Sequence, residues 1–409
     1  MDLYMVWMEW AFFVAGGLLV VASVWAFVEG MDFLRLVRRA MQRPHANYAP
    51  PAAVVIPCKG VDAEFDSSLE RFLMQDYPHY QVIFAVATAG ELAHRRLQAR
   101  LDARGAARRS YPTSLVVAGL SGVRGEKVNN LLCGVAAVDP SMELLVFADI
   151  DCAPAGDWLR SLVAPLADPL VTVSTGFRWY LPGAGFVSKL RAAWDTSIAT
   201  LMGDHNRNFA WGGSMAMRVA DFRALGIAER YWAATVSDDY AVTRAVREAN
   251  GRIAFEPRCL VASREESTLA DFLHWSTRQI IITRVYAAHL WRLGLANYLY
   301  YCGTLALGFI LLAWPGTPAW VRIAAALTLL AVLVLGAGKG AIRSAVTREL
   351  FGAEAGSGHV CYWLLAPLVP WVMLWNFVAA GFTRRIEWRG TGYELISQDR
   401  VRVTRRSGD

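Results

Sequence analysis

Long apolar stretches constrain the fold of this chain more than any other feature. Residues 10–28 form an uninterrupted apolar run of about the length that spans a bilayer. Asp2 and Glu9 precede this run, where a signal peptide would carry basic residues. The arginines that follow it are Arg35, Arg38, Arg39 and Arg43. Because cytoplasmic flanks are enriched in basic residues, we expect the N-terminus outside and the following section in the cytoplasm.

Two further apolar stretches, residues 293–314 and 319–338, are joined by a turn of prolines and glycine at 315–318. The basic residues that come after the second stretch are Lys339, Arg343 and Arg348. Each stretch is long enough for a membrane span. Together they predict a pair of spans that returns the chain to the cytoplasmic side.

A fourth apolar stretch, residues 360–382, contains Pro367 and Pro370. It is too short to cross the bilayer twice, and proline interrupts a helix. One interpretation is a re-entrant or interface-lying hairpin. A single span that leaves the C-terminus outside is the other.

The middle of the chain alternates strand-like and helix-like segments. Short apolar runs typical of buried strands lie at residues 53–57, 81–86, 114–118 and 144–149. Amphipathic stretches lie between them, as at 67–74 and 91–103. This alternation predicts an α/β fold with a mostly parallel sheet covered on both faces. Ligands of such sheets bind beyond the carboxyl ends of the strands.

We therefore expect an integral membrane protein in five parts. These are an N-terminal transmembrane helix with a basic linker (1–45), a cytosolic α/β domain (46–265), amphipathic interface helices (266–292), C-terminal transmembrane or re-entrant helices (293–382) and a cytosolic tail (383–409). The interface helices are suggested by aromatic and aliphatic residues mixed with Arg278, Arg284 and His289, although an amphipathic core helix would show the same pattern.

A pair of carboxylates, Asp149 and Asp151, ends the fourth strand-like run. Residues i and i+2 of a strand point the same way, so both carboxylates can face one site. Two buried carboxylates are costly unless a cation neutralises them, and oxygen ligands suit Mg²⁺ or Mn²⁺. The pair predicts a metal site that carries a diphosphate. A cap at the start of a loop, or a solvated turn, fits the same two residues.

A second pair, Asp238 and Asp239, opens a helix-like stretch at 240–250. Either Asp239 is a general base with Asp238 beside it, or the pair caps the helix and complements its dipole. Trp211, followed by Gly212 and Gly213, fits a close approach of the backbone to a ligand, or an ordinary turn.

Two basic residues are candidates for phosphate binding. Lys127 starts a helix-like stretch whose N–H groups can meet a nucleotide, or it is a solvated helix start. Arg278 lies just before the second apolar stretch, where it can clamp a diphosphate or face lipid head groups.

Other function classes have little support. The net charge is only +6, and no basic run with interleaved aromatics predicts nucleic-acid binding. The six cysteines are scattered without a CxxC pair, which argues against zinc and for a reduced, cytosol-facing protein. No phosphate-binding P-loop and no GxGxxG fingerprint is present, which argues against kinases, ATPases and dinucleotide-dependent dehydrogenases.

The order of these motifs resembles the ceramide glucosyltransferase family, within the inverting membrane glycosyltransferases of families 2 and 21. The blocks that carry the resemblance begin at Lys59, Asp76, Lys127, Asp149, Gly212 and Asp238, with a last motif around Arg278 and a further element at 387–390. The resemblance implies a cytosolic GT-A domain, a UDP-sugar donor, Mg²⁺ or Mn²⁺, and a lipid acceptor that enters from the bilayer. The expected location is the inner membrane of a bacterium. It gives Asp149 and Asp151 the metal and nucleotide role, Asp239 the role of base, and Arg278 that of the last motif's arginine.

The chain departs from the family pattern in three places. The last motif carries Trp275 at its first position and Gln279 where a tryptophan is usual. Thr88 stands near the family's first aspartate, with Glu91 as the nearest carboxylate, and Asp238 replaces a glutamate. The residues expected to bind substrate or nucleotide are Lys59, Thr88, Glu91, Lys127, Asn130, Asp149, Trp211, Gly212, Gly213, Ser214, Trp275 and Gln279.

The expected activity is transfer of a hexose from a UDP-sugar to ceramide. Glucose is the expected hexose, and the expected product is a β-glycoside. A hopanoid or diacylglycerol acceptor is a close alternative, and a processive polysaccharide synthase is a second. A transporter would need more spans and leaves the large cytosolic domain unexplained. A catalytically inactive binding protein is a further alternative, and the replacement of the family's first aspartate is the observation that supports it.

Overall fold

The computed structural model describes residues 3–105, 112–356 and 358–405. The chain forms two compact units. The helical unit comprises Met1–Arg38, Tyr180–Thr200 and Arg264–Thr383, and the sheet unit comprises Arg39–Trp179, Leu201–Ser263 and Arg384–Asp409.

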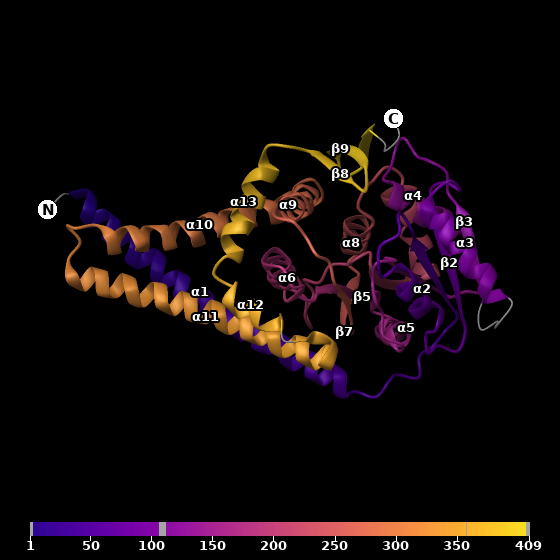
Figure 1. The fold of residues 1–409 in the computed structure, drawn as a ribbon, viewed down its shortest axis with the longest axis horizontal. Helices are drawn as coiled ribbons and strands as arrows, with labels where there is room; N and C mark the ends of the chain where they lie inside the picture. The colour runs from indigo at the N-terminus through magenta and orange to yellow at the C-terminus, as the bar shows by residue number, and fades with distance from the viewer. Residues whose placement is uncertain (1–2, 106–111, 357, 406–409) are drawn as a thin grey trace. The chain divides into compact units, whose positions relative to one another are not determined.

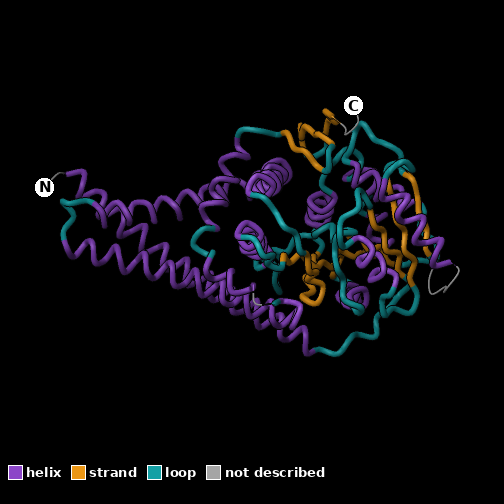
Figure 2. The backbone as a smooth tube through the Cα atoms, in the orientation of Figure 1, coloured by secondary structure: helices purple, strands orange, loops and turns teal. Residues whose placement is uncertain are grey.

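A seven-stranded sheet organises the sheet unit, with strand order β3-β2-β1-β4-β6-β5-β7. Figure 1 labels several of its strands, and Figure 2 shows strands in orange and helices in purple. The strands are β1 (Ala52–Pro57), β2 (Tyr80–Val86), β3 (Thr113–Val117), β4 (Leu144–Ala148), β5 (Val171–Tyr180), β6 (Ser214–Arg218) and β7 (Arg252–Ser263). β1 pairs in parallel with β2 and β4, and β2 pairs in parallel with β3. β6 runs antiparallel to both β4 and β5, so β5 points the same way as the first four strands. The expected mostly parallel α/β sheet is confirmed.

Alternate residues of the central strands enter two different cores. Val54 of β1 and Val146 of β4 face one core, while Val55 and Phe147 face the other. The helices of the sheet unit are α2 (Phe65–Leu73), α3 (Leu92–Gly105), α4 (Glu126–Ala136), α5 (Trp158–Val163), η1 (Ala164–Ala167), α7 (Val219–Ala224), η2 (Ile227–Tyr231) and α8 (Asp238–Glu248). Apolar side chains of α2, α3 and α5 fill the first core, and those of α4, α7 and α8 fill the second. The strands are apolar on both faces because helices cover both.

The end of the chain adds a small antiparallel sheet of β8 (Arg385–Trp388), β9 (Thr391–Ser397) and β10 (Arg400–Arg405). A two-residue turn of Arg389 and Gly390 joins β8 to β9, and both residues have positive φ values, of 45° and 78°. This conformation is typical of tight hairpins, and glycine adopts it at little cost. The expected tail thus folds as part of the sheet unit.

The helical unit consists of α1 (Leu3–Gln42), α6 (Phe186–Ala199), α9 (Leu269–Tyr286), α10 (Ala288–Ala313), α11 (Ala319–Phe351), η3 (Gly352–Ala355), η4 (Gly358–Val360), α12 (Cys361–Leu364) and α13 (Val369–Gly381). Three of its helices, α1, α10 and α11, are long and apolar enough to cross a membrane. Phe12 of α1 packs against Leu311 of α10 and Val321 of α11. Exposed apolar side chains, such as Trp25 and Leu327, cover the outside, as expected of lipid-facing helices.

The fourth apolar stretch is broken. Residues Gly358–Leu364 and Val369–Gly381 form two helical pieces bent by 75°. Pro367 lies in the break and Pro370 at the start of α13, where proline fits a helix. The proline-broken geometry agrees with the sequence, and both a broken span and a re-entrant loop fit it.

The segment expected to lie in the membrane interface is mainly α9. A capping box formed by Thr268 and Asp271 starts this helix. Its ring of Trp275 contacts those of Trp194 and Tyr180, with centroids 5.2 and 5.6 Å apart. One face of α9 is therefore buried against α6, and its position at a membrane interface stays a prediction.

Candidate active site

Most of the predicted site residues that belong to the sheet unit lie at one edge of the seven-stranded sheet. β1, β2 and β4 are parallel, so the segments that follow them share this edge. β6 is antiparallel to β4, and its start, after Trp211, Gly212 and Gly213, therefore meets the end of β4. The N–H of Asp149 donates to the carbonyl of Gly213 over 3.4 Å, which joins the two segments directly.

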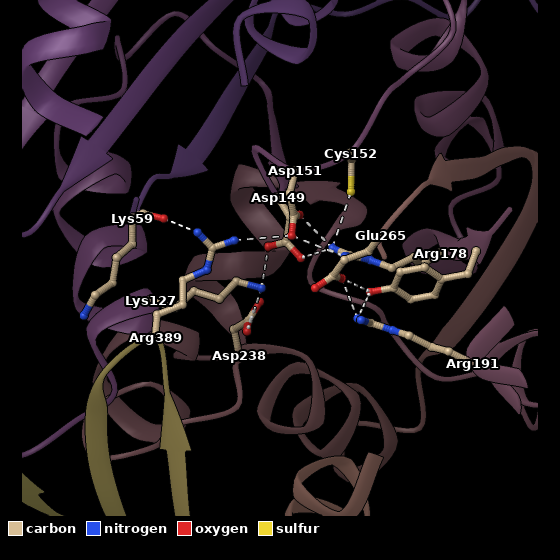
Figure 3. Close-up of polar contacts among 11 residues, drawn as sticks. Lys59, Lys127, Asp149, Asp151, Cys152, Arg178, Arg191, Asp238, Glu265 and Arg389 are labelled. Atoms are coloured by element: carbon tan, nitrogen blue, oxygen red, sulfur yellow. Dashed lines mark hydrogen bonds and ion pairs between the residues drawn. The ribbon is translucent and has the colours of Figure 1, made fainter. Parts of the chain in front are cut away.

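Asp149 and Asp151 share one guanidinium, that of Arg178 on β5 (Figure 3). Arg178 Nη2 lies 2.8 Å from Asp151 Oδ1 and 3.3 Å from Asp149 Oδ2. Burial raises the pKa of Asp151, but Arg178, followed by Arg389 and Lys127, outweighs this effect and lowers the pKa overall. Both carboxylates thus contact one guanidinium, and Asp151 is held in its charged form. The expected strand geometry is not the cause, because β4 ends at Ala148 and both aspartates lie in the turn that follows it.

Lys127 connects this pair to the second pair of aspartates. From the first turn of α4, its Nζ lies 2.9 Å from Asp149 Oδ1 and 3.2 Å from Asp238 Oδ1 (Figure 3). Burial alone would lower the pKa of Lys127, but the carboxylates of Asp149 and Asp238 raise it well above its usual value. Lys127 is therefore a buried, permanently charged ammonium group and not a solvated helix start.

The two glycines before β6 leave room for these charges. A Cβ on Gly212 would lie 1.9 Å from Asp238 Oδ2 and 2.9 Å from Lys127 Nζ. A Cβ on Gly213 would lie 2.3 Å from the ring of Trp211 and 2.9 Å from Asp149 Oδ2. Any side chain at either position would collide with the ionic cluster, so glycine is required here by close approach.

Asp238 and Asp239 start α8, but Ser237 is the residue that caps it. The Ser237 hydroxyl accepts from the Tyr240 N–H, and Asp239 Oδ1 accepts from the same N–H over 2.8 Å. Asp238 is only 2% exposed and turns inward to Lys127. Burial raises the pKa of Asp238 to about 7; the ammonium of Lys127 opposes this shift, and the charge of Asp239 adds to it.

Lys59 and Glu91 lie near each other beyond β1 and β2. Lys59 Nζ is 2.8 Å from Glu126 Oε2 and donates to Thr391 Oγ1 over 3.0 Å. Burial, and then the charge of Glu126, raise the pKa of Glu91, while Lys59 opposes them. Glu91 Oε2 is buried and has no hydrogen-bond partner among the described residues. Thr88, whose carbonyl accepts from the Glu91 N–H, lies at the same edge.

Several predicted residues are engaged elsewhere. Asn130 is 1% exposed within α4, and the Ser214 hydroxyl accepts from Trp158 Nε1 over 2.9 Å. Arg278, Trp275 and Gln279 all lie on α9 in the helical unit. Trp275 is packed against aromatic rings and the guanidinium of Arg191. Contacts of these five residues with a substrate stay predictions.

The donor atoms at the end of β4 fit a hard divalent cation. One ligand atom each from Asp149, Asp151 and Cys152 lies within 4.8 Å of the others. Burial raises the pKa of Cys152 well above its usual value, so this residue is a thiol and not a thiolate. The two carboxylates are the effective donors, and oxygen donors suit Mg²⁺ and Mn²⁺. Arg178 already contacts both carboxylates, so a bound metal would either share their oxygens with Arg178 or displace its guanidinium.

Two cationic residues of the site have no role in the sequence-based prediction, although Arg389 belongs to the similar element at 387–390. Arg178 stands on β5 among buried residues, and Arg389 lies in the β8–β9 turn, where it reaches the Lys59 carbonyl and lies 3.5 Å from Asp151 Oδ2. A charged residue inside an otherwise apolar strand was the available signal for Arg178, because a buried charge needs a partner.

Comparison with known proteins gives a family and a set of distant neighbours. A family model described as glycosyl transferase family 21 matches residues 18–401. No curated protein matches the chain significantly. A mannosyltransferase from Pyrobaculum calidifontis, solved with GDP-Man and Mn²⁺, is similar at 16% identity and a TM-score of 0.45, covering 89% of this chain and 96% of its own.

Glucosyl-3-phosphoglycerate synthase from Mycobacterium tuberculosis is also similar. Its complex with Mn²⁺, UDP and phosphoglyceric acid matches at 15% identity and a TM-score of 0.37, over 61% of this chain and 81% of its own. The family match, together with the sheet topology described above, confirms the fold class and the glycosyltransferase class expected from the sequence.

Proposed function

The chain belongs to glycosyl transferase family 21, and from this premise we propose that it moves glucose from UDP-glucose to ceramide, with inversion to a β-glycoside. One observation supports the proposal most: Asp149, Asp151 and Asp238 converge with Lys127 around two glycines that no side chain can replace. A cluster of carboxylates and cations beside bare backbone suits a metal-bound diphosphate.

In this proposal Asp149 and Asp151 hold Mg²⁺ or Mn²⁺, as their convergent oxygens fit. The metal, when bound, supplies positive charge that stabilises the departing diphosphate. Lys127 and Arg178 add charge that the protein itself carries, and each already contacts the carboxylates. The resemblance to the family adds Arg278 as a further phosphate ligand.

Asp239 is the proposed base. Its Oδ1 is held by the Tyr240 N–H and by the Ser237 hydroxyl, which fixes the carboxylate at the start of α8. The acceptor hydroxyl gives its proton to Asp239 as its oxygen attacks the anomeric carbon. The bond from this carbon to the UDP oxygen breaks at the same time, and UDP leaves with the electron pair. Attack opposite the leaving group inverts the configuration.

The lipid acceptor is proposed on two grounds. Three helices of the chain are long and apolar enough to cross a membrane, which suits an acceptor dissolved in the bilayer. The motifs of the sheet unit resemble enzymes that act on ceramide. A hopanoid or diacylglycerol would meet the same requirement for a membrane alcohol.

A transfer assay tests the proposal. The full chain in detergent is mixed with UDP-glucose, UDP-galactose or GDP-mannose, and with ceramide, a hopanoid polyol, diacylglycerol or no acceptor. The lipids are then identified by mass spectrometry. Hexosylceramide formed from UDP-glucose supports the proposal. A product on another lipid would overturn the choice of ceramide, polymer without acceptor would favour a polysaccharide synthase, and no product with any pair would contradict the activity.

A further inference from the structure

Two basic residues near the end of α11 form no ion pair within the described part of the chain. Lys339 and Arg343 are four residues apart, so they project from the same face of the helix. Arg343 is only 7% exposed. Neither side chain makes a hydrogen bond or an ion pair with any described residue. A buried guanidinium without a counterion is costly, so its surroundings need explanation.

The groups around Arg343 do not neutralise it. The titratable groups that act on it are the phenols of Tyr298 on α10 and Tyr362 on α12. The Tyr362 hydroxyl already donates to the Tyr180 carbonyl over 2.8 Å. Lys339 is repelled by Arg343 and attracted by Glu29, the one carboxylate that acts on it. Two cations and one carboxylate leave this part of the helical unit with a net positive charge.

The position along the helix suggests which anion is available. α11 begins at Ala319, and Lys339 and Arg343 follow 20 and 24 residues later. At ~1.5 Å per residue these are about 30 and 36 Å from the start of the helix, against a hydrocarbon core of about 30 Å. If the span begins at Ala319, both charges lie at the level of the head groups, where lipid phosphates are.

The helices around Arg343 are closely packed. A Cβ on Gly340 would lie 2.4 Å from both the Trp363 Cα and the Tyr362 carbonyl oxygen, so α11 and α12 touch through their backbones. Ser344 adds to this contact, because its hydroxyl donates to the His359 carbonyl over 2.6 Å. Arg343 lies between Gly340 and Ser344, so it belongs to the segment of α11 that packs against α12 and the residues before it, and it is itself buried.

We propose that Lys339 and Arg343 bind the phosphate of a membrane lipid beside α10, α11 and α12. A guanidinium matches a phosphate through two parallel hydrogen bonds, and the ammonium adds a second charge. The Tyr298 hydroxyl, which has no hydrogen bond within the described part of the chain, is a third donor. The phosphate can belong to a phospholipid of the bilayer or to a phosphate-bearing acceptor.

Lipid retention tests the site independently of transferase activity. The full chain is purified in detergent, stripped of loose lipid and examined by native mass spectrometry. Its melting temperature is then measured with phosphatidylglycerol, with diacylglycerol of the same acyl chains, and with inorganic phosphate. We expect wild-type protein to retain a single phospholipid and to be stabilised by phosphatidylglycerol alone. Arg343→Gln should bind this lipid about tenfold more weakly or worse.

Two variants serve as controls. Arg348→Gln removes the same charge from an exposed position of the same helix and should retain the lipid. Lys339→Gln, at a half-buried position, tests the site if Arg343→Gln does not fold. Equal retention by wild type and both site variants would overturn the proposal. Equal stabilisation by diacylglycerol would overturn the role of phosphate, and equal stabilisation by inorganic phosphate would overturn the role of a lipid.

The source of the phosphate is decided with the same samples. Transfer to ceramide in neutral detergent, enhanced by added phosphatidylglycerol, would assign the site to a bilayer lipid. Transfer of hexose onto the retained phosphate-bearing lipid itself would assign it to the acceptor. Loss of the retained lipid without loss of transfer to ceramide in Arg343→Gln would support the site and would exclude the retained lipid as the acceptor.

Discussion

The guanidinium of Arg178 donates to Asp151 through both terminal nitrogens, with Nη2 2.8 Å from Oδ1 and Nη1 3.3 Å from Oδ2. Asp151 is one of the two carboxylates proposed to hold the metal. The side chain of Arg178 is only 14% exposed, so water does not compete strongly for this contact. In this structure the protein supplies its own cation at the position where a divalent cation is proposed to bind.

Removal of this internal cation should strengthen metal binding. In Arg178→Gln, Mn²⁺ no longer competes with a charged bidentate contact, so its affinity without nucleotide should rise about tenfold, or ~1.4 kcal/mol. Titration calorimetry of Mn²⁺ measures the change. Arg178→Lys, which keeps the charge, should stay close to wild type. An unchanged Mn²⁺ affinity in Arg178→Gln would show that Arg178 and the metal do not share the carboxylates.

The bare backbone at Gly212 should be indispensable for donor binding. The Cβ of Gly212→Ala would lie 1.9 Å from Asp238 Oδ2, so the contacts of Lys127 must shift. We expect UDP affinity to fall at least tenfold, as measured by calorimetry. Gly156→Ala is the matched control, because its Cβ would meet no atom within 4 Å. Equal UDP affinity in the two variants would remove the glycine pair from the binding site.

The strands and their carboxyl ends could be read from the sequence because they depend on local patterns. The apolar runs of β1 and β4 end just before Lys59 and Asp149. The parallel pairing of these two strands then brings both residues to one edge of the sheet. Side-chain direction inside helices was harder to predict. Asn129 and Asn130 are neighbours in α4, yet Asn129 bonds the Ala118 and Gly119 carbonyls while Asn130 is buried.

The contacts made by residues from distant parts of the chain could not be predicted from local patterns. Arg178 reaches Asp151 across 27 positions and Arg389 across 238, and neither contact leaves a periodic pattern in the sequence. The same holds for Tyr180–Thr200, which joins the helical unit although it lies between strands of the sheet unit. Trp194 explains this: its indole donates to Asn376 of α13 over 3.0 Å, a contact set by tertiary packing alone.

Asp239→Asn tests the proposed base. The amide cannot accept a proton, so turnover should fall by about 10²–10⁴, while UDP affinity stays within a few-fold because Asp239 does not contact the metal-site carboxylates. Single-turnover transfer and UDP calorimetry separate the two effects. Asn can still accept from the Tyr240 N–H, so the start of α8 should remain intact. Turnover close to wild type would exclude Asp239 as the base.

Asp238 should make the stability of the metal-free protein depend on pH. Its pKa rises from 3.8 to about 7 on folding, so the folded state binds the proton more tightly than the unfolded state. This contribution is fully present below pH 3.8 and is lost as the pH rises toward 7. In EDTA, the melting temperature of wild type minus that of Asp238→Asn should therefore decrease as the pH rises from 3.8 to about 7. A difference that is constant with pH would contradict the raised pKa.

The small C-terminal sheet should contribute to donor binding through Arg389. This side chain reaches the Lys59 carbonyl and lies 3.5 Å from Asp151 Oδ2, while the Tyr393 hydroxyl accepts from the Glu126 N–H over 3.2 Å. Arg389→Asn removes the guanidinium but keeps a residue that tolerates the positive φ of 45°, so the hairpin should remain folded. We expect UDP affinity to fall several-fold, since one cation is lost beside the proposed diphosphate site.

Arg402→Gln is the control for this change. Arg402 lies on β10 of the same small sheet, is exposed and pairs with Glu394 over 3.2 Å, so its removal should leave UDP affinity unchanged. The two variants carry the same loss of charge and differ in distance from the aspartates. If both lowered UDP affinity equally, the effect would come from net charge. If neither did, the C-terminal sheet would stabilise Lys59 and Glu126 without taking part in binding.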